Sequence, residues 1–91
     1  EIVTTPETSE EVTETAVGIS KAAGRDISMV KDAPGTYGFI LNRVFAAAYR
    51  EAKTIVDDGL ATPEDVDRAM ITGRNWPAGF FGHRGGIGKQ W

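Results

Sequence analysis

The feature that most constrains this chain is a long amphipathic pattern between Gly38 and Asp58. Its apolar residues recur at intervals of three and four, which is the period of one helical face. Other apolar residues between positions 46 and 49 widen this face, so we predict a helix about 30 Å long that packs against two neighbours. One of these neighbours can belong to another subunit. The stripe comprises Leu41, Val44, Phe45, Ala48, Ala52, Ile55 and Val56.

Two shorter helices are expected on either side of the long one, which Gly59 should end. Thr8 and Glu11 have the spacing of a capping box, and a helical apolar stripe follows, so we predict a helix over residues 9–23. The run Thr62-Pro63-Glu64-Asp65 combines a capping hydroxyl, a proline and acidic residues, which is typical of a helix start. We expect that third helix to end at Gly73.

Two short segments, Glu1–Thr5 and Asp26–Lys31, have the composition of strands. They either pair with each other or lie at the edge of a sheet outside this chain. The predicted fold is all-α, a small bundle of three main helices with a short C-terminal helix and one or two stray strands. The expected core is Leu41, Val44, Phe45, Ala48, Ile55, Val56, Val66 and Met70.

Length and charge exclude several classes of protein. A chain of 91 residues forms at most one small domain. The net charge of −3 argues against a general nucleic-acid binder, and no apolar run is long enough for a membrane span. The chain lacks a basic-then-apolar opening and any cysteine, so we expect neither a signal peptide nor a disulfide, and a cytoplasmic location. The basic tail, with Arg74, Arg84 and Lys89, either meets an anionic ligand or is a solvated end.

The residues that carry chemistry are few. His83 is the single histidine and stands in a glycine-rich tail, where we expect a surface residue. No metal-ligand spacing is present, so we predict no metal site. The tail glycines, Gly82 among them, follow no strand and do not form a dinucleotide-binding motif. Asn42, at the start of the long helix, either caps the helix or points at a ligand. From the residues alone, the chain resembles a helical accessory domain.

Several short motifs occur along the chain, and their order and spacing together are more specific for one family than any single motif is. They are Glu1-Ile2-Val3 with Thr8-Ser9, then Lys31-Asp32, Gly38-Phe39-Ile40-Leu41-Asn42-Arg43, Glu51-Ala52, Gly59, Glu64-Asp65-Val66-Asp67, Ala69-Met70, Gly73, Trp76-Pro77 and Gly79. In this order the chain resembles the C-terminal domain of the 3-hydroxyacyl-CoA dehydrogenases, which has the helical fold of the 6-phosphogluconate dehydrogenase C-terminal domain. Its opening strand resembles the last strand of their Rossmann domain.

The resemblance implies an NAD-dependent oxidation of 3-hydroxyacyl-CoA to 3-ketoacyl-CoA, in fatty-acid metabolism and β-oxidation. NAD would be bound by an N-terminal Rossmann domain of the same chain, with no cofactor in this fragment, which would be inactive alone. Glu1 sits at the position of the catalytic Glu that orients a His, and Asn42 at that of the Asn near the reacting end of the substrate. That His lies upstream, and His83 is not its counterpart.

The resemblance also implies an organisation and a set of partners. Residues 1–8 would be the end of a Rossmann strand and its turn, and residues 9–91 the helical domain for dimerisation and substrate binding. The partners would be an acyl-CoA, the Rossmann domain and a second copy in a homodimer, without nucleic acid or membrane. Two alternatives stay open: a non-catalytic helical dimerisation module, and a related dehydrogenase of a free hydroxy acid.

Overall fold

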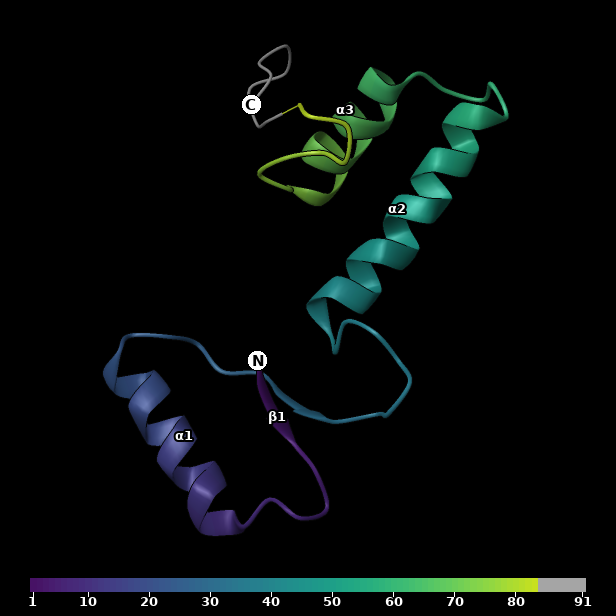
Figure 1. The fold of residues 1–91 in the computed structure, drawn as a ribbon. Helices are drawn as coiled ribbons and strands as arrows, with labels where there is room; N and C mark the ends of the chain where they lie inside the picture. Colours follow the sequence, from purple (N-terminus) through teal and green to yellow (C-terminus); the bar gives the residue numbers. More distant parts are fainter. Residues whose placement is uncertain (84–91) are drawn as a thin grey trace. The chain divides into compact units, whose positions relative to one another are not determined.

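The computed structural model describes residues 1–83 of the chain (Figure 1). They form two strands, β1 (Ile2–Thr4) and β2 (Met29–Lys31), and three helices, α1 (Glu10–Ala22), α2 (Leu41–Asp57) and α3 (Pro63–Arg74). Helix predominates, which confirms the predicted class. Residues 75–83 contain no helix, so the predicted short C-terminal helix is absent from them. The chain divides into two compact units, residues 1–45 and 46–91, which are described separately.

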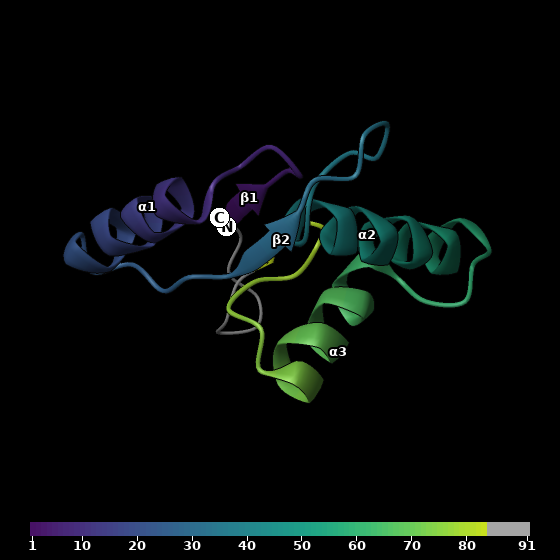
Figure 2. The same ribbon diagram turned by 90° about the horizontal axis from the view of Figure 1, so that it is seen from below.

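The first unit begins with a strand–helix–strand arrangement. β1 and β2 pair in parallel, with Val3 opposite Val30, and lie side by side in Figure 2. Bonds from Ile2 N to Ser28 O and from Asp32 N to Thr4 O, both 2.8 Å, extend the pair at its two ends. Parallel strands need a crossover connection, and α1 supplies it. The two predicted strands therefore pair with each other.

Local caps explain the limits of α1. Ser9 is the N-cap, and its Oγ accepts a hydrogen bond from Val12 N at 3.1 Å. The predicted capping box from Thr8 is wrong, because the Thr8 hydroxyl accepts from Thr5 N in the preceding turn instead. At the other end, Gly24 adopts a φ of 74°, and its N–H donates to Lys21 O. A left-handed glycine of this kind ends a helix at little cost.

α2 starts later than predicted, at Leu41, because Gly38 and Phe39 both have positive φ angles of 97° and 43°. It ends as expected at Gly59, whose φ is 71° and whose N–H donates to Val56 O. Among the described residues, no helix is both long and apolar enough to cross a membrane.

α3 is capped at both ends by its own sequence. The Thr62 hydroxyl accepts from Asp65 N at 3.1 Å, and Pro63 occupies the first helical position. The predicted end at Gly73 is wrong, because the helix continues to Arg74 and Asn75 takes the left-handed conformation, with a φ of 56°. Asparagine is the residue other than glycine that most readily adopts it.

The buried apolar residues lie within residues 46–83: they are Ala52, Val66 and Ile71, which are 4%, 9% and 8% exposed. Of the predicted core, Val66 is confirmed. The prediction is wrong for Leu41, Val44 and Phe45, which are 69%, 65% and 46% exposed. Leu41 and Val44 stay exposed because no described residue covers them, so helical periodicity identified an apolar face but not its cover. The other four predicted core residues, Ala48, Ile55, Val56 and Met70, are partly exposed.

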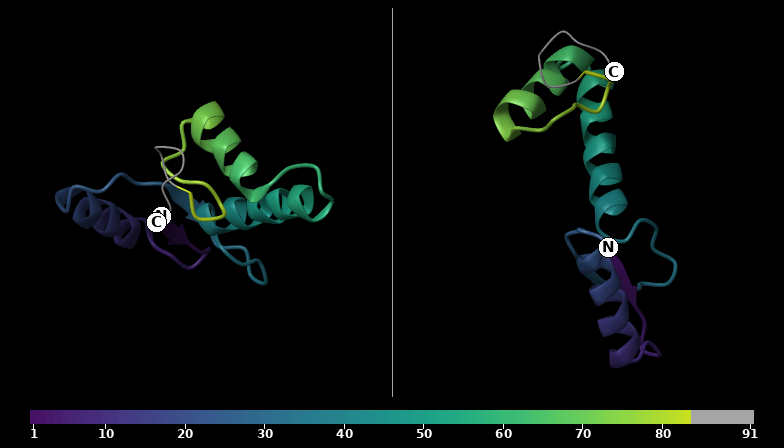
Figure 3. Two further views of the ribbon diagram at one scale, coloured as in Figure 1. Left: turned by 90° about the horizontal axis from the view of Figure 1, so that it is seen from above. Right: turned by 90° about the vertical axis from the view of Figure 1, so that its left-hand side faces the viewer.

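After α3 the chain turns back alongside this helix (Figure 3). Its aromatic side chains contact one another and α2: the Trp76 and Phe80 ring centroids lie 5.1 Å apart, and Tyr49 lies 6.2 Å from Phe80 and 5.9 Å from Phe81. The Trp76–Phe80 and Tyr49–Phe80 pairs are edge-to-face, an arrangement that stabilises packed aromatic side chains. These ring contacts hold the segment after α3 against α2, and Trp91 lies outside the described residues.

Candidate functional site

The N-terminus of α2 receives a carboxylate from the first residue of the chain. Glu1 Oε1 accepts a hydrogen bond from Leu41 N at 2.6 Å, and Oε2 accepts one from Ile40 N at 3.4 Å. The first N–H groups of a helix have no partner inside it, and the helix dipole favours an anion there. Glu1, which directly precedes β1, therefore caps α2 from 40 positions away in the sequence.

The backbone before α2 has an unusual conformation where Glu1 binds. A Cβ on Gly38 would lie 2.6 Å from Arg43 N, and its φ is 97°, so only glycine fits. Phe39 follows with a φ of 43°, which is uncommon for an aromatic residue. Such strain persists where the surroundings enforce it, and it is concentrated at functional sites.

Asn42 is the second residue of α2, directly after the Leu41 N–H that Glu1 accepts. Its side chain is exposed and makes no hydrogen bond within residues 1–83. The capping role considered for Asn42 belongs to Glu1 instead. The structure thus brings both predicted site residues to one helix end, with an anchored carboxylate beside an amide that has no partner there.

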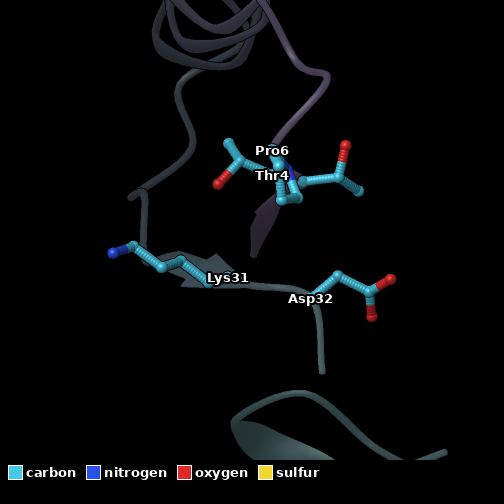
Figure 4. Close-up of a pocket in the computed structure, with 5 residues that line it drawn as sticks. Thr4, Pro6, Lys31 and Asp32 are labelled. Atoms are coloured by element: carbon cyan, nitrogen blue, oxygen red, sulfur yellow. The ribbon is translucent and has the colours of Figure 1, made fainter. Parts of the chain in front are cut away.

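A pocket of about 270 Å³ lies at the carboxyl ends of β1 and β2 (Figure 4). It is lined by Thr4, Thr5, Pro6, Lys31 and Asp32. The charged ends of Lys31 and Asp32 point in opposite directions (Figure 4), so they do not converge on one ligand group. The pocket is therefore a hollow beside the strand pair rather than a set of aligned catalytic groups.

A second polar centre lies within residues 46–83, around Asp67. This side chain is 0% exposed. Its carboxylate accepts from Phe81 N, at 3.1 Å to each oxygen, and from His83 N at 3.1 Å, while His83 Nδ1 lies 2.7 Å from Oδ2. The expectation that His83 is a surface residue is wrong, because its side chain is only 16% exposed. A buried carboxylate holds it there.

Sequence reasoning missed the role of Asp67, although a signal was present. Met70 and Ile71 follow it by three and four residues, so Asp67 lies on the inward face of α3. A charged residue on an apolar face needs partners. Gly79 explains how they approach, because a Cβ there would overlap the Asp67 carboxylate.

Neither centre has the donors of a metal site: among residues 1–83, no group of three or more His, Cys, Asp or Glu side chains is placed to hold an ion. Of the basic tail, only Arg74 belongs to the described residues, and it is exposed at the end of α3. Arg84 and Lys89 lie outside them.

Comparison with known proteins identifies the class to which this fold and helix end belong. The family model for the 3-hydroxyacyl-CoA dehydrogenase C-terminal domain matches residues 38–89, which is more than half of the chain. The chain belongs to this family.

Individual relatives agree with the family match. The chain is 40% identical over 81 residues to the human mitochondrial hydroxyacyl-coenzyme A dehydrogenase, covering 89% of this chain and 25% of the relative. It is 42% identical over 70 residues to an L-carnitine dehydrogenase of Staphylococcus epidermidis, covering 77% and 21%. The crystal structure of (S)-3-hydroxybutyryl-CoA dehydrogenase from Ralstonia eutropha superposes with a TM-score of 0.73 at 32% identity, covering 85% and 26%. The chain thus spans about a quarter of the length of these relatives.

Proposed function

We propose that this chain is the C-terminal part of an NAD-dependent 3-hydroxyacyl-CoA dehydrogenase, which oxidises the 3-hydroxyl of an acyl-CoA to a ketone. The observation that carries the proposal is the 2.6 Å hydrogen bond that places the Glu1 carboxylate on Leu41 N, beside Asn42. The relatives named hydroxyacyl-CoA dehydrogenase support the same reaction. On its own, without an NAD-binding domain and a catalytic His, the chain is expected to be inactive.

In this proposal Glu1 positions and charges the catalytic His of the missing domain. The two backbone N–H groups at the start of α2 hold the Glu1 carboxylate in place. An ionised carboxylate behind a His stabilises the imidazolium that forms when the ring removes the hydroxyl proton. Because the α2 backbone fixes the carboxylate, it also fixes the orientation of that ring.

Asn42 is proposed to bind the reacting end of the substrate. Its amide can donate to the oxygen that becomes a carbonyl, where a fixed donor is most effective. NAD, held by the N-terminal domain of the same chain, supplies the hydride acceptor. We assign no residue of this chain to NAD.

The test uses the full-length protein with NAD and 3-hydroxybutyryl-CoA. Replacing Asn42 by Ala should lower kcat by about 10²–10³-fold without changing the oligomeric state. Asn75→Ala is the matched control, because Asn75 caps the distant end of α3 and should leave kcat unchanged at a temperature where the variant is folded. Altered assembly with normal turnover would instead favour the non-catalytic helical module. Turnover by the 91-residue chain alone would contradict the proposal.

A second candidate is a dehydrogenase of a free hydroxy acid, which the 42% identity to an L-carnitine dehydrogenase favours. The sequence identities of the two classes of relative are similar. The full-length protein should be assayed with 3-hydroxybutyryl-CoA and with L-carnitine at equal concentrations. A kcat/KM higher for the thioester supports the acyl-CoA enzyme, and the reverse order supports the second candidate.

We also propose that the exposed face of Leu41 and Val44 forms part of a homodimer interface. These side chains are 69% and 65% exposed at the start of α2, and apolar patches of this kind mark contacts between proteins. Replacing Val44 by Glu should shift the full-length protein from dimer to monomer in sedimentation velocity, whereas Val12→Glu on α1 should not. An unchanged dimer in the Val44 variant would show that this face is not part of the interface.

A cytoplasmic location stays a prediction.

A further inference from the structure

The loop of residues 33–40, which joins β2 to α2, exposes several large apolar side chains. Tyr37 is 80% exposed, the largest fraction for such a side chain within residues 1–83, and Phe39 and Ile40 are 46% and 39% exposed. The loop projects beyond the strand pair in Figure 2. Exposed apolar patches mark surfaces that bind a ligand or another protein, so this patch, residues 37–40, is a candidate binding surface.

Hydrogen bonds on both sides fix the backbone that carries Tyr37. Before it, Thr36 N donates to Ala33 O at 3.0 Å in a turn, and after it Arg43 N donates to Gly38 O at 3.1 Å at the start of α2. The Tyr37 side chain makes no hydrogen bond or ring contact within residues 1–83. An aromatic ring on a fixed backbone loses little conformational entropy when it binds a ligand, because little beyond the rotation of the side chain is restricted.

The patch adjoins both residues to which the proposed reaction is assigned. Gly38 follows Tyr37 and packs so closely on α2 that a Cβ there would lie 3.0 Å from Asn42 Cβ. At the end of the patch, Ile40 N donates to Glu1 Oε2 at 3.4 Å. A ligand whose reacting end is bound at Asn42 therefore has its next atoms close to the patch.

The chemistry of the patch selects one part of such a ligand. Two chains leave the carbon that carries the 3-hydroxyl of an acyl-CoA: the apolar acyl tail, and the thioester with its polar, anionic CoA. Residues 33–41 contain no charged side chain, so nothing in this loop compensates the phosphates of CoA. An apolar surface stabilises the acyl tail instead, because it removes methylene groups from water.

We propose that Tyr37, with Phe39 and Ile40, contacts the acyl tail and makes the enzyme a dehydrogenase of medium-chain rather than short-chain 3-hydroxyacyl-CoA. This inference rests on the function proposed above. The body of the Tyr37 ring covers methylene groups of the tail, while its hydroxyl stays in water. These contacts exist only for the longer substrates, so Tyr37 determines specificity and takes no part in the proton or hydride transfer.

The test compares two substrates, 3-hydroxydecanoyl-CoA and 3-hydroxybutyryl-CoA, on the full-length protein with NAD. The ratio of their kcat/KM values, decanoyl over butyryl, should exceed one in the native protein. Tyr37→Ala should lower this ratio about ten-fold, the effect of returning roughly two methylene groups to water, and Tyr37→Phe, which keeps the ring, should retain it. Leu60→Ala is the matched control, because Leu60 is 75% exposed beyond the other end of α2, and its ratio should equal the native one.

Each outcome decides the proposal. A native ratio below one, an unchanged ratio in Tyr37→Ala, or a loss in Tyr37→Phe as large as in Tyr37→Ala would overturn it. Any of these results with turnover of both substrates leaves the proposed function intact, whereas no turnover of either acyl-CoA by the native protein contradicts that function itself. Partial unfolding of a variant does not obscure the comparison, because it lowers both kcat/KM values in the same proportion.

Discussion

Glu1 and Asp67 are two carboxylates that both accept backbone N–H groups, but they lie in contrasting surroundings. Glu1 is exposed and binds Ile40 N and Leu41 N at the start of a helix. Asp67 is completely buried and binds Phe81 N together with the backbone N and the ring Nδ1 of His83. The two carboxylates therefore accept from similar donors, but only the Glu1 carboxylate is exposed to solvent.

The difference teaches that burial, rather than hydrogen bonding, separates a structural carboxylate from one available for chemistry. A buried carboxylate whose acceptors are occupied holds its own chain together, and its loss leaves donors unpaired. An exposed carboxylate at a helix start is anchored but can still face a group from another domain. This contrast predicts large stability effects at one site and large activity effects at the other.

The largest stability effect is expected for Asp67→Asn. The amide nitrogen cannot accept, so buried donors lose their partner, and the free energy of unfolding should fall by about 4 kcal/mol. Denaturant unfolding of the full chain measures it. Asp58→Asn is the matched control, because Asp58 is exposed, and should change the free energy by less than about 0.5 kcal/mol. Equal losses of unfolding free energy in the two variants would contradict the structural role assigned to the buried carboxylate.

Ile71→Ala should come next, with a loss of about 3 kcal/mol, because Ile71 is 8% exposed and its truncation leaves a cavity. Leu41→Ala removes an apolar side chain of similar size that is 69% exposed, so the monomeric chain should lose less than about 0.5 kcal/mol. The midpoints of denaturant unfolding at low protein concentration compare them. A Leu41 effect as large as that of Ile71 would mean that the α2 face is covered.

Gly79→Ala should cost about 2 kcal/mol, because the added methyl group overlaps the Asp67 carboxylate and the segment must shift. Gly18→Ala is the control, since a Cβ there meets nothing within 4 Å and alanine favours a helix interior. Thermal unfolding should show a lower Tm for the first variant and an equal or higher Tm for the second. A Tm for Gly79→Ala equal to that of the native chain would show that Asp67 has room to move.

The smallest effect is expected for Lys53→Ala on α2. Its ammonium lies 2.6 Å from Asp57 Oδ2, and this hydrogen bond raises the pKa of Lys53 above the ordinary lysine value. A raised pKa stabilises the folded state at neutral pH and ceases to do so once the pH rises above it. Because both side chains are exposed, solvent screens the pair, and the Tm at pH 7 should not change measurably. A clear drop would show that surface pairs matter as much as the buried centre.

Local signals explain which parts of the fold were predictable. Gly24, Gly59 and Thr62 each act on backbone groups within a few residues, so the sequence is sufficient to place those helix ends. The cap of α1 was misplaced by one residue, because Thr8 and Ser9 both carry a hydroxyl. The end of α3 was predicted wrongly at Gly73. Gly73 and Asn75 stand two positions apart, both residue types adopt the left-handed conformation that ends a helix, and side-chain type alone does not choose between them.

The site was only partly predictable, because its contacts are long-range. Resemblance to the family led to Glu1 and Asn42, but the bond from Leu41 to Glu1 joins residues 40 positions apart, and no local pattern encodes it. Asp67 and His83 are 16 positions apart. His83 was interpreted by its glycine-rich neighbours, whereas its burial depends on a carboxylate from another element.

The most direct test of the central contrast is the turnover of Glu1→Gln in the full-length protein, assayed with 3-hydroxybutyryl-CoA and NAD under conditions where the variant is folded. Gln keeps the size of the side chain and an oxygen that can accept from Leu41 N, but it has no charge to stabilise an imidazolium. We predict that kcat falls by about 10²–10⁴-fold, while the Tm changes far less than in Asp67→Asn. A normal kcat in a folded Glu1→Gln protein would contradict the account, because the exposed carboxylate would then serve only as a helix cap.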